Sequence, residues 1–156
     1  MIGLSRSDVA IRVPRANSRP GDWEIVKIFM VDDDKDAVEP IIETLEEYGD
    51  HRVTKVSTVR EAEAEFSAGS WKYDLFIIDI QIKPGPDEKI TEEESLVAGL
   101  SLVQKFRARF KDNRILILSN NLYRVPREFW PGDVNTRAYD KTEVFGGRIL
   151  DILRNW

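Results

Sequence analysis

The sequence predicts one α/β domain: a doubly wound, five-stranded parallel sheet with helices on both faces. Short apolar runs alternate with segments of helical character five times along the chain, and this alternation is typical of such sheets. The apolar runs are nearly unbroken, as expected for strands that are buried on both sides. The length of 156 residues allows one domain with its own core and is too short for two comfortable domains.

The expected strands are apolar runs that end in polar residues. The run IVKIFMV ends in three successive aspartates, and the run DLFIIDI is almost wholly apolar until its end. The run RILILS ends in a serine, and two shorter and weaker segments complete the set. The five expected strands span residues 25–31, 51–56, 74–80, 114–119 and 136–140.

The first two helices carry start and stop signals. Apolar residues recur at helical spacing over 38–48, and Gly49 follows as a stop. Pro40 lies inside this segment, so a kink or a first helical turn is expected there. Thr58 and Glu61 form the pattern of a capping box, which predicts a second helix that runs from Thr58 to about residue 68.

The later helices are separated by a long acidic segment. Residues 83–94 are expected to form a solvated loop; a lid over a functional site or a partner contact is the alternative. Helices are expected at 95–110 and at 142–156. The pair Gly146-Gly147 lies within the last of these, where it costs about 1 kcal/mol per glycine relative to alanine. Close packing of this helix against a neighbour is the expected reason for the pair.

Composition limits the function classes. The chain has 23 basic and 28 acidic residues, a net charge of -5, so a direct nucleic-acid ligand is not expected. It has no cysteine, which excludes disulfides, thiolate metal sites and cysteine nucleophiles. No apolar run approaches the roughly 18 residues of a membrane span. The first residues lack the apolar region of a secretory signal, so a cytoplasmic protein without membrane contact is expected.

Residues 1–22 are expected to lie outside the folded domain, which then spans 23–156. This N-terminal segment has four arginines, only two acids and a terminal Pro-Gly pair, and it shows no periodic apolar pattern. A flexible extension is the expected state. A basic arm that docks on a partner or folds back on the domain is the alternative.

Side chains that can bind a metal or take part in catalysis lie at or directly after the carboxyl ends of four of the five expected strands. Because the carboxyl ends of parallel strands meet at one edge of the sheet, these side chains are expected to converge there. They are Asp32, Asp33, Asp79, Ser119 and Lys141.

Such a cluster suits phosphoryl chemistry on a carboxylate. Three neighbouring carboxylates repel one another, and Mg2+ relieves this repulsion while it retains sites for water and phosphate oxygens. A carboxylate beside Mg2+ and Lys141 can attack phosphorus, and the two cations then neutralise charge on the transferred oxygens. Ser119 can donate a hydrogen bond to the phosphoryl group.

The runs IFMVDDD, DLFIIDI, ILILS and DK resemble the response-regulator receiver domain, the CheY-like unit of two-component signalling, over residues 25–156. The resemblance implies a flavodoxin-like sheet in the order 2-1-3-4-5 and a bound Mg2+. It implies that Asp79 is the phosphoacceptor, that Ser119 is the switch hydroxyl and that Lys141 is the lysine of the family's site. The implied magnesium ligands are Asp33 directly, Asp32 as an assisting residue, Asp79, and the backbone carbonyl of Gln81.

The resemblance also implies partners. A sensor histidine kinase or a phosphotransfer protein would donate the phosphoryl group to Asp79. No output domain follows Trp156, so the signal is expected to leave through an unknown downstream protein, and a homodimer remains open. The chain is not expected to be an enzyme beyond its own autocatalytic phosphorylation and slow self-dephosphorylation.

Two departures from the family pattern favour an alternative. Receivers usually have a proline after the lysine, where this chain has Thr142, and a switch aromatic three residues before it, where this chain has Ala138. Tyr139 is the neighbour of that position, and side chains alternate faces along a strand. The alternative is a receiver-like interaction module that does not depend on phosphorylation. An aspartate-nucleophile phosphatase is disfavoured, because such enzymes have a second aspartate where this chain has Gln81.

Overall fold

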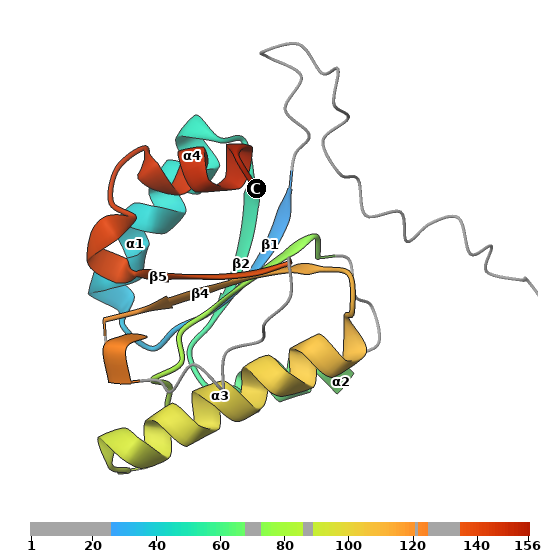
Figure 1. The fold of residues 1–156 in the computed structure, drawn as a ribbon, viewed down its shortest axis with the longest axis vertical. Coiled ribbons are helices and arrows are strands. Elements are labelled where there is room, and N and C mark those ends of the chain that lie inside the picture. Colours follow the sequence, from blue (N-terminus) through green and yellow to red (C-terminus); the bar gives the residue numbers. More distant parts are fainter. Residues whose placement is uncertain (1–25, 68–72, 86–88, 121, 125–134) are drawn as a thin grey trace, which may run out of the picture.

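A computed structural model describes residues 26–67, 73–85, 89–120, 122–124 and 135–156. These residues form a five-stranded, all-parallel sheet in the order β2-β1-β3-β4-β5, which confirms the predicted fold class and strand order (Figure 1). The expected N-terminal extension lies outside the described residues. The strands are β1 (Lys27–Val31), β2 (Arg52–Val56), β3 (Leu75–Ile78), β4 (Arg114–Ser119) and β5 (Thr136–Asp140).

Helices cover both faces of the sheet. Figure 1 shows α1 and α4 on one side and α2 and α3 on the other. None of the helices in the described part of the chain has the length and apolar content needed to cross a membrane. The helices are α1 (Lys35–Glu43), which continues as the π-helix η2 (Thr44–Tyr48), then α2 (Val59–Ser67), α3 (Glu92–Arg109) and α4 (Arg148–Arg154).

The core has two halves because side chains alternate faces along each strand. In β1, Phe29 packs into the cluster beneath α2 and α3, whereas Met30 packs into the cluster beneath α1 and α4. Aromatic rings fill the first half, where Phe76 and Phe106 have ring centroids 4.7 Å apart. This double burial explains why the strands read as unbroken apolar runs.

Helix α3 begins earlier than the sequence pattern predicted. Its N-cap is Thr91, whose side chain accepts a hydrogen bond from the Glu94 backbone, while the Glu94 carboxylate accepts one from the Thr91 backbone. The expected boundary at residue 95 was therefore wrong, because the acidic run was interpreted as loop. Three acidic side chains in the first turn are favourable near the positive end of the helix dipole.

The expected last helix at 142–156 was also wrong. The chain forms the short 3-10 helix η5 (Lys141–Glu143) and then a turn, and only Arg148–Arg154 is α-helical. Gly146 adopts a left-handed φ of 62°, which favours glycine. A Cβ atom on Gly146 or Gly147 would meet nothing within 4 Å, so close packing does not explain the pair.

The loop that follows β3 is not wholly solvated. Ile82 is fully buried, and the backbone N–H groups of Val59 and Arg60 donate to the carbonyls of Lys83 and Pro84, at 3.0 Å each. The first turn of a helix leaves such N–H groups without intrahelical partners. The loop supplies these partners for α2, so its first residues are held against that helix.

Gly99 allows α3 to pack directly on the backbone beyond β3. A Cβ atom at this position would lie 1.9 Å from the Ile80 carbonyl oxygen, a distance that forces the helix or the strand end to move. Ile80 is the neighbour of Asp79, so this contact fixes the backbone next to a predicted site residue.

We expect Gly99→Ala to lower the free energy of unfolding by about 2 kcal/mol or more, because the added methyl group meets backbone that cannot rotate away. Gly147→Ala is the matched control: Gly147 has a φ of -67° and open space around it, and the change should stay within about 0.5 kcal/mol. Urea unfolding of both variants measures the difference. Equal effects would contradict the packing argument.

Candidate functional site

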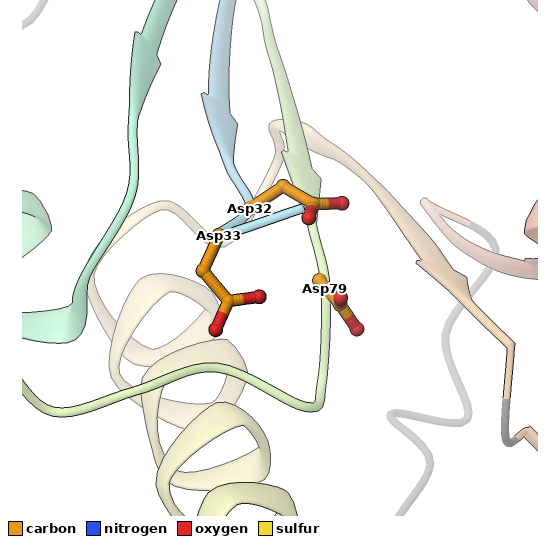
Figure 2. A group of neighbouring side chains, drawn as sticks. All are labelled: Asp32, Asp33 and Asp79. Atoms are coloured by element: carbon orange, nitrogen blue, oxygen red, sulfur yellow. The ribbon is translucent and has the colours of Figure 1, made fainter. Parts of the chain in front are cut away.

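Three aspartates meet at the carboxyl edge of the central strands. Asp32 and Asp33 follow β1, and Asp79 follows β3. Each offers a carboxylate oxygen, and these oxygens all lie within 4.8 Å of one another. Figure 2 shows the three side chains grouped where the two strands end. The predicted convergence of these carboxylates is therefore present in the structure.

The pairing of β1 with β3 places the aspartates. Val31 is in register with Ile78, so the next residues, Asp32 and Asp79, leave the sheet side by side. The Asp79 N–H donates to the Val31 carbonyl at 2.9 Å, and the Asp32 N–H donates to the Val56 carbonyl at 3.1 Å. The sheet ladder thus continues one residue beyond the strands and fixes the backbone of both acids.

Lys141 joins the cluster from the edge of the sheet. It directly follows β5, and its ammonium Nζ lies 2.7 Å from Asp32 Oδ2 and 2.8 Å from Asp79 Oδ2. Asp32, Asp79 and Lys141 are all buried, so these ion pairs are largely shielded from water. The ammonium supplies hydrogen bonds as well as charge to both carboxylates.

Local backbone groups orient the other carboxylate oxygens. Asp79 Oδ1 accepts a hydrogen bond from the Gln81 N–H at 2.9 Å, and Asp32 Oδ1 accepts one from the Asp34 N–H at 2.9 Å. Asp34 in turn caps α1 by accepting from the Ala37 N–H. Each buried carboxylate is therefore held at both oxygens. The metal-ligand role of the Gln81 carbonyl stays a prediction.

Burial and like charges shift the pKa values in the cluster. Burial, with the charge of Asp79 added to it, raises the pKa of Asp32 to about 6 against the opposing effect of Lys141. Burial also raises the pKa of Asp79. Burial alone would lower the pKa of Lys141, but Asp79 and Asp32 outweigh it, and the pKa is raised. Lys141 therefore stays charged beside both acids.

The net negative charge of the ionised cluster would be neutralised by a divalent cation. Three carboxylates against one ammonium leave two uncompensated negative charges. All the donor atoms are oxygens, which is the preference of hard ions such as Mg2+. The residues present fit Mg2+ by charge and by donor type.

Ser119 is fully buried at the end of β4 and pairs in register with Asp140. Alternation along β4 turns Ser119 toward the α2/α3 face, because Ile117 packs there and Leu118 packs on the other face. Tyr139 packs on the α1/α4 face, so Ser119 and Tyr139 lie on opposite sides of the sheet. The role of Ser119 as a switch hydroxyl stays a prediction.

The sequence patterns did not single out Asp140, the last residue of β5. Asp140 Oδ1 accepts hydrogen bonds from the backbone N–H and the hydroxyl of Thr142, at 2.9 and 2.8 Å. The peptide bonds of the described residues are all trans, which includes the bond between Lys141 and Thr142. An aspartate two residues before a threonine is the signal of such a turn, but it is common and weak by itself.

No family model matches the chain, and no curated protein matches it by sequence. Many solved structures do match. A CheY-like receiver domain from Methylobacillus flagellatus is 22% identical with a TM-score of 0.60, over 85% of this chain and 98% of that one. Chemotaxis protein CheY4 from Vibrio cholerae is 21% identical with a TM-score of 0.62, over the same shares, 85% and 98%.

A third match comes from a sensor kinase. It is the receiver domain of a sensor histidine kinase from Pseudomonas aeruginosa, with a magnesium ion coordinated in its active site cleft. It is 22% identical with a TM-score of 0.55, over 85% of this chain and 98% of that one. At these identities the matches show the fold: this chain has the fold of response-regulator receiver domains.

Without divalent ions, we expect the acid cluster to lower stability as the pH rises. The pKa of Asp32 in the folded state, about 6, lies above its ordinary 3.8, so the fold favours the protonated form. This contribution is fully present below pH 3.8 and is lost as the pH rises through 6. Relative to Asp32→Asn, the wild type should lose on the order of 2 kcal/mol between about pH 4 and pH 7.

Urea unfolding in a metal chelator across this pH range measures the effect. Asp36→Asn, which removes an exposed acid of α1, is the matched control and should keep the wild-type profile. An Asp32→Asn protein with the same pH profile as the wild type would contradict the electrostatic account.

Proposed function

We propose that the protein is a phosphorylation-controlled signalling switch. In this proposal a sensor histidine kinase or a phosphotransfer protein donates a phosphoryl group to Asp79. One observation carries the proposal: the Asp79 carboxylate lies among two further carboxylates and 2.8 Å from a buried ammonium, at the carboxyl edge of a parallel sheet. The receiver fold supports it.

Asp32, Asp33 and Asp79, with the backbone carbonyl of Gln81, would hold Mg2+. When bound, the ion supplies positive charge beside the transferred phosphoryl oxygens. The donor set of this chain supports that assignment, and so does the magnesium ion in the receiver domain from Pseudomonas aeruginosa.

The residues of the chain perform the remaining steps. A carboxylate oxygen of Asp79 attacks phosphorus, a new P–O bond forms, and the bond to the leaving atom of the donor breaks with its electron pair. Lys141 stays protonated and stabilises the negative charge of the phosphoryl oxygens. Asp79 is only 5% exposed and Asp33 is half-buried, so in this proposal the donor approaches from the side of Asp33.

Phosphorylation replaces the single negative charge of the Asp79 carboxylate with a phosphoryl group that carries roughly -2, in a nearly closed site. In the proposal Ser119 donates its hydroxyl hydrogen bond to the new group, and the protein shifts toward a state that a downstream partner recognises. Tyr139 faces the other side of the sheet and does not take part in this contact. In this proposal the chain accepts one phosphoryl group per molecule, so it acts as an acceptor and not as a turnover enzyme. We also propose that the protein is cytoplasmic.

A second candidate is an interaction module that does not need phosphorylation. The low exposure of Asp79 and the placement of Ser119 and Tyr139 on opposite faces favour it. It differs from the first in one consequence: partner binding is indifferent to Mg2+ and to Asp79→Asn.

We expect incubation with acetyl phosphate and Mg2+ to add one phosphoryl group, and intact-mass spectrometry measures it. Asp79→Asn should abolish the addition, because the amide is a poor nucleophile. Asp74→Asn is the matched control: Asp74 precedes the same strand at its other end, and the variant should be modified like the wild type. Chelation of Mg2+ should prevent the reaction.

Two results would defeat the proposal: an unchanged mass for the wild type, or the same mass increase in Asp79→Asn. If the mass of the wild type stays unchanged while a partner binds the wild type and Asp79→Asn equally, the interaction module is the better account.

A further inference from the structure

The turn between β5 and η5 is built around one side-chain oxygen. Asp140 is the last residue of β5 and has extended backbone angles, φ -68° and ψ 138°. Its Oδ1 accepts from both the N–H and the hydroxyl of Thr142, at 2.9 and 2.8 Å. This arrangement is an Asx turn that also caps the 3-10 helix.

The residue enclosed by this turn is Lys141. On one side the Asp140 carboxylate fixes the backbone, and on the other the fully buried Val144 anchors it in the α1/α4 core. The Val144 N–H also donates to the Lys141 carbonyl at 3.4 Å. The Lys141 backbone is thus held at two points, and its side chain is directed inward to Asp32 and Asp79.

We propose that Asp140 is a positioning residue for Lys141: its hydrogen bonds to Thr142 set the turn that delivers the ammonium to the two buried carboxylates. Its part in phosphoryl transfer rests on the proposed function. The placement of Lys141 between Asp32 and Asp79 does not, because the structure shows it directly.

Asp140 acts through its oxygen as an acceptor and not through its charge. The carboxylates that act on the charge of Lys141 are Asp79 and Asp32, which contact it. The Asp140 carboxylate instead turns toward Thr142. An asparagine offers the same acceptor oxygen without the charge, so Asp140→Asn should preserve the turn.

Thr142 and Asp140 form a matched pair. Receivers usually carry proline at the position of Thr142, and proline has no N–H to donate. In this chain the Thr142 N–H donates to Asp140, and the hydroxyl donates a second bond to the same oxygen. The departure from the family pattern at Thr142 is thereby accounted for: it provides the donor that Asp140 needs.

The first readout does not depend on phosphorylation. Acetic anhydride acetylates exposed lysines, and peptide mass mapping in a metal chelator follows Lys141, which is 2% exposed. Lys141 should be protected in the wild type and in Asp140→Asn. In Asp140→Ala, Lys141 should react about fivefold faster, in line with the usual loss of stability when a helix cap is removed. In Thr142→Val its rate of acetylation should lie between those of the wild type and Asp140→Ala.

The second readout is the initial rate of phosphorylation by acetyl phosphate at saturating Mg2+. Asp140→Ala should lower the maximal rate by about fivefold and leave the half-saturating concentration of acetyl phosphate unchanged. Asp140→Asn should restore the rate. Circular dichroism tests whether each variant is folded. Asp74→Ala is the control for loss of a carboxylate, because Asp74 precedes β3 at the end of the sheet opposite to the site.

Two outcomes overturn the positioning role: Lys141 stays protected in Asp140→Ala, or Asp140→Asn is as impaired as Asp140→Ala. If the wild type accepts no phosphoryl group while the Lys141 reactivities follow the expected order, the positioning role stands and the proposed function fails. The two hypotheses are therefore tested separately.

Discussion

The structure depends on one buried ammonium shared by two carboxylates. Lys141 lies between Asp32 and Asp79, at 2.7 and 2.8 Å, and all three groups are nearly sealed from water. Removal of the lysine would leave two like charges in a medium that screens them poorly, a situation that costs several kcal/mol in comparable buried pairs. Lys141 and Asp79 are 62 residues apart in sequence, and Lys141 follows an edge strand. The site therefore exists only when β5 has paired with the rest of the sheet.

The apolar strands make this charged cluster tolerable. β1 and β3 bury every apolar side chain on both faces. An aspartate directly follows the last apolar residue of each strand, where the ladder hydrogen bonds still hold the backbone. The charge balance is not complete: a third acid, Asp33, leaves the ionised cluster two charges short of neutrality. The pKa values of Asp32 and Asp79 are raised because burial outweighs the opposing effect of Lys141. The uncompensated charge lowers the stability of the free protein, and it is the charge that the proposed divalent ion would neutralise.

The sequence was informative where one local signal determines the structure. The bounds of β4 and β5 follow from the residues themselves, and the convergence of Asp32, Asp79 and Lys141 follows from parallel pairing. The strand order came only from the family resemblance, because no residue pattern encodes which strands are neighbours. The start of α3 was missed because acidic residues suit both loops and first helical turns. The Asp140 turn was missed because an aspartate two residues before a threonine is a common pattern. It indicates a role at the site only once Lys141 is known to be buried between these two residues.

The contacts of Asp79 lead away from it in two directions. Through Ile80 the backbone after β3 touches Gly99 of α3, and through the carbonyls of Lys83 and Pro84 it holds the first turn of α2. Through Lys141 the same carboxylate is tied to η5 and the core beneath α1 and α4. In the proposed function, a phosphoryl group on Asp79 would compete with the Gln81 N–H for Oδ1 or with Lys141 for Oδ2, so it would act where these routes begin. In the proposed positioning role, the Asp140 turn would determine how firmly the second route is held.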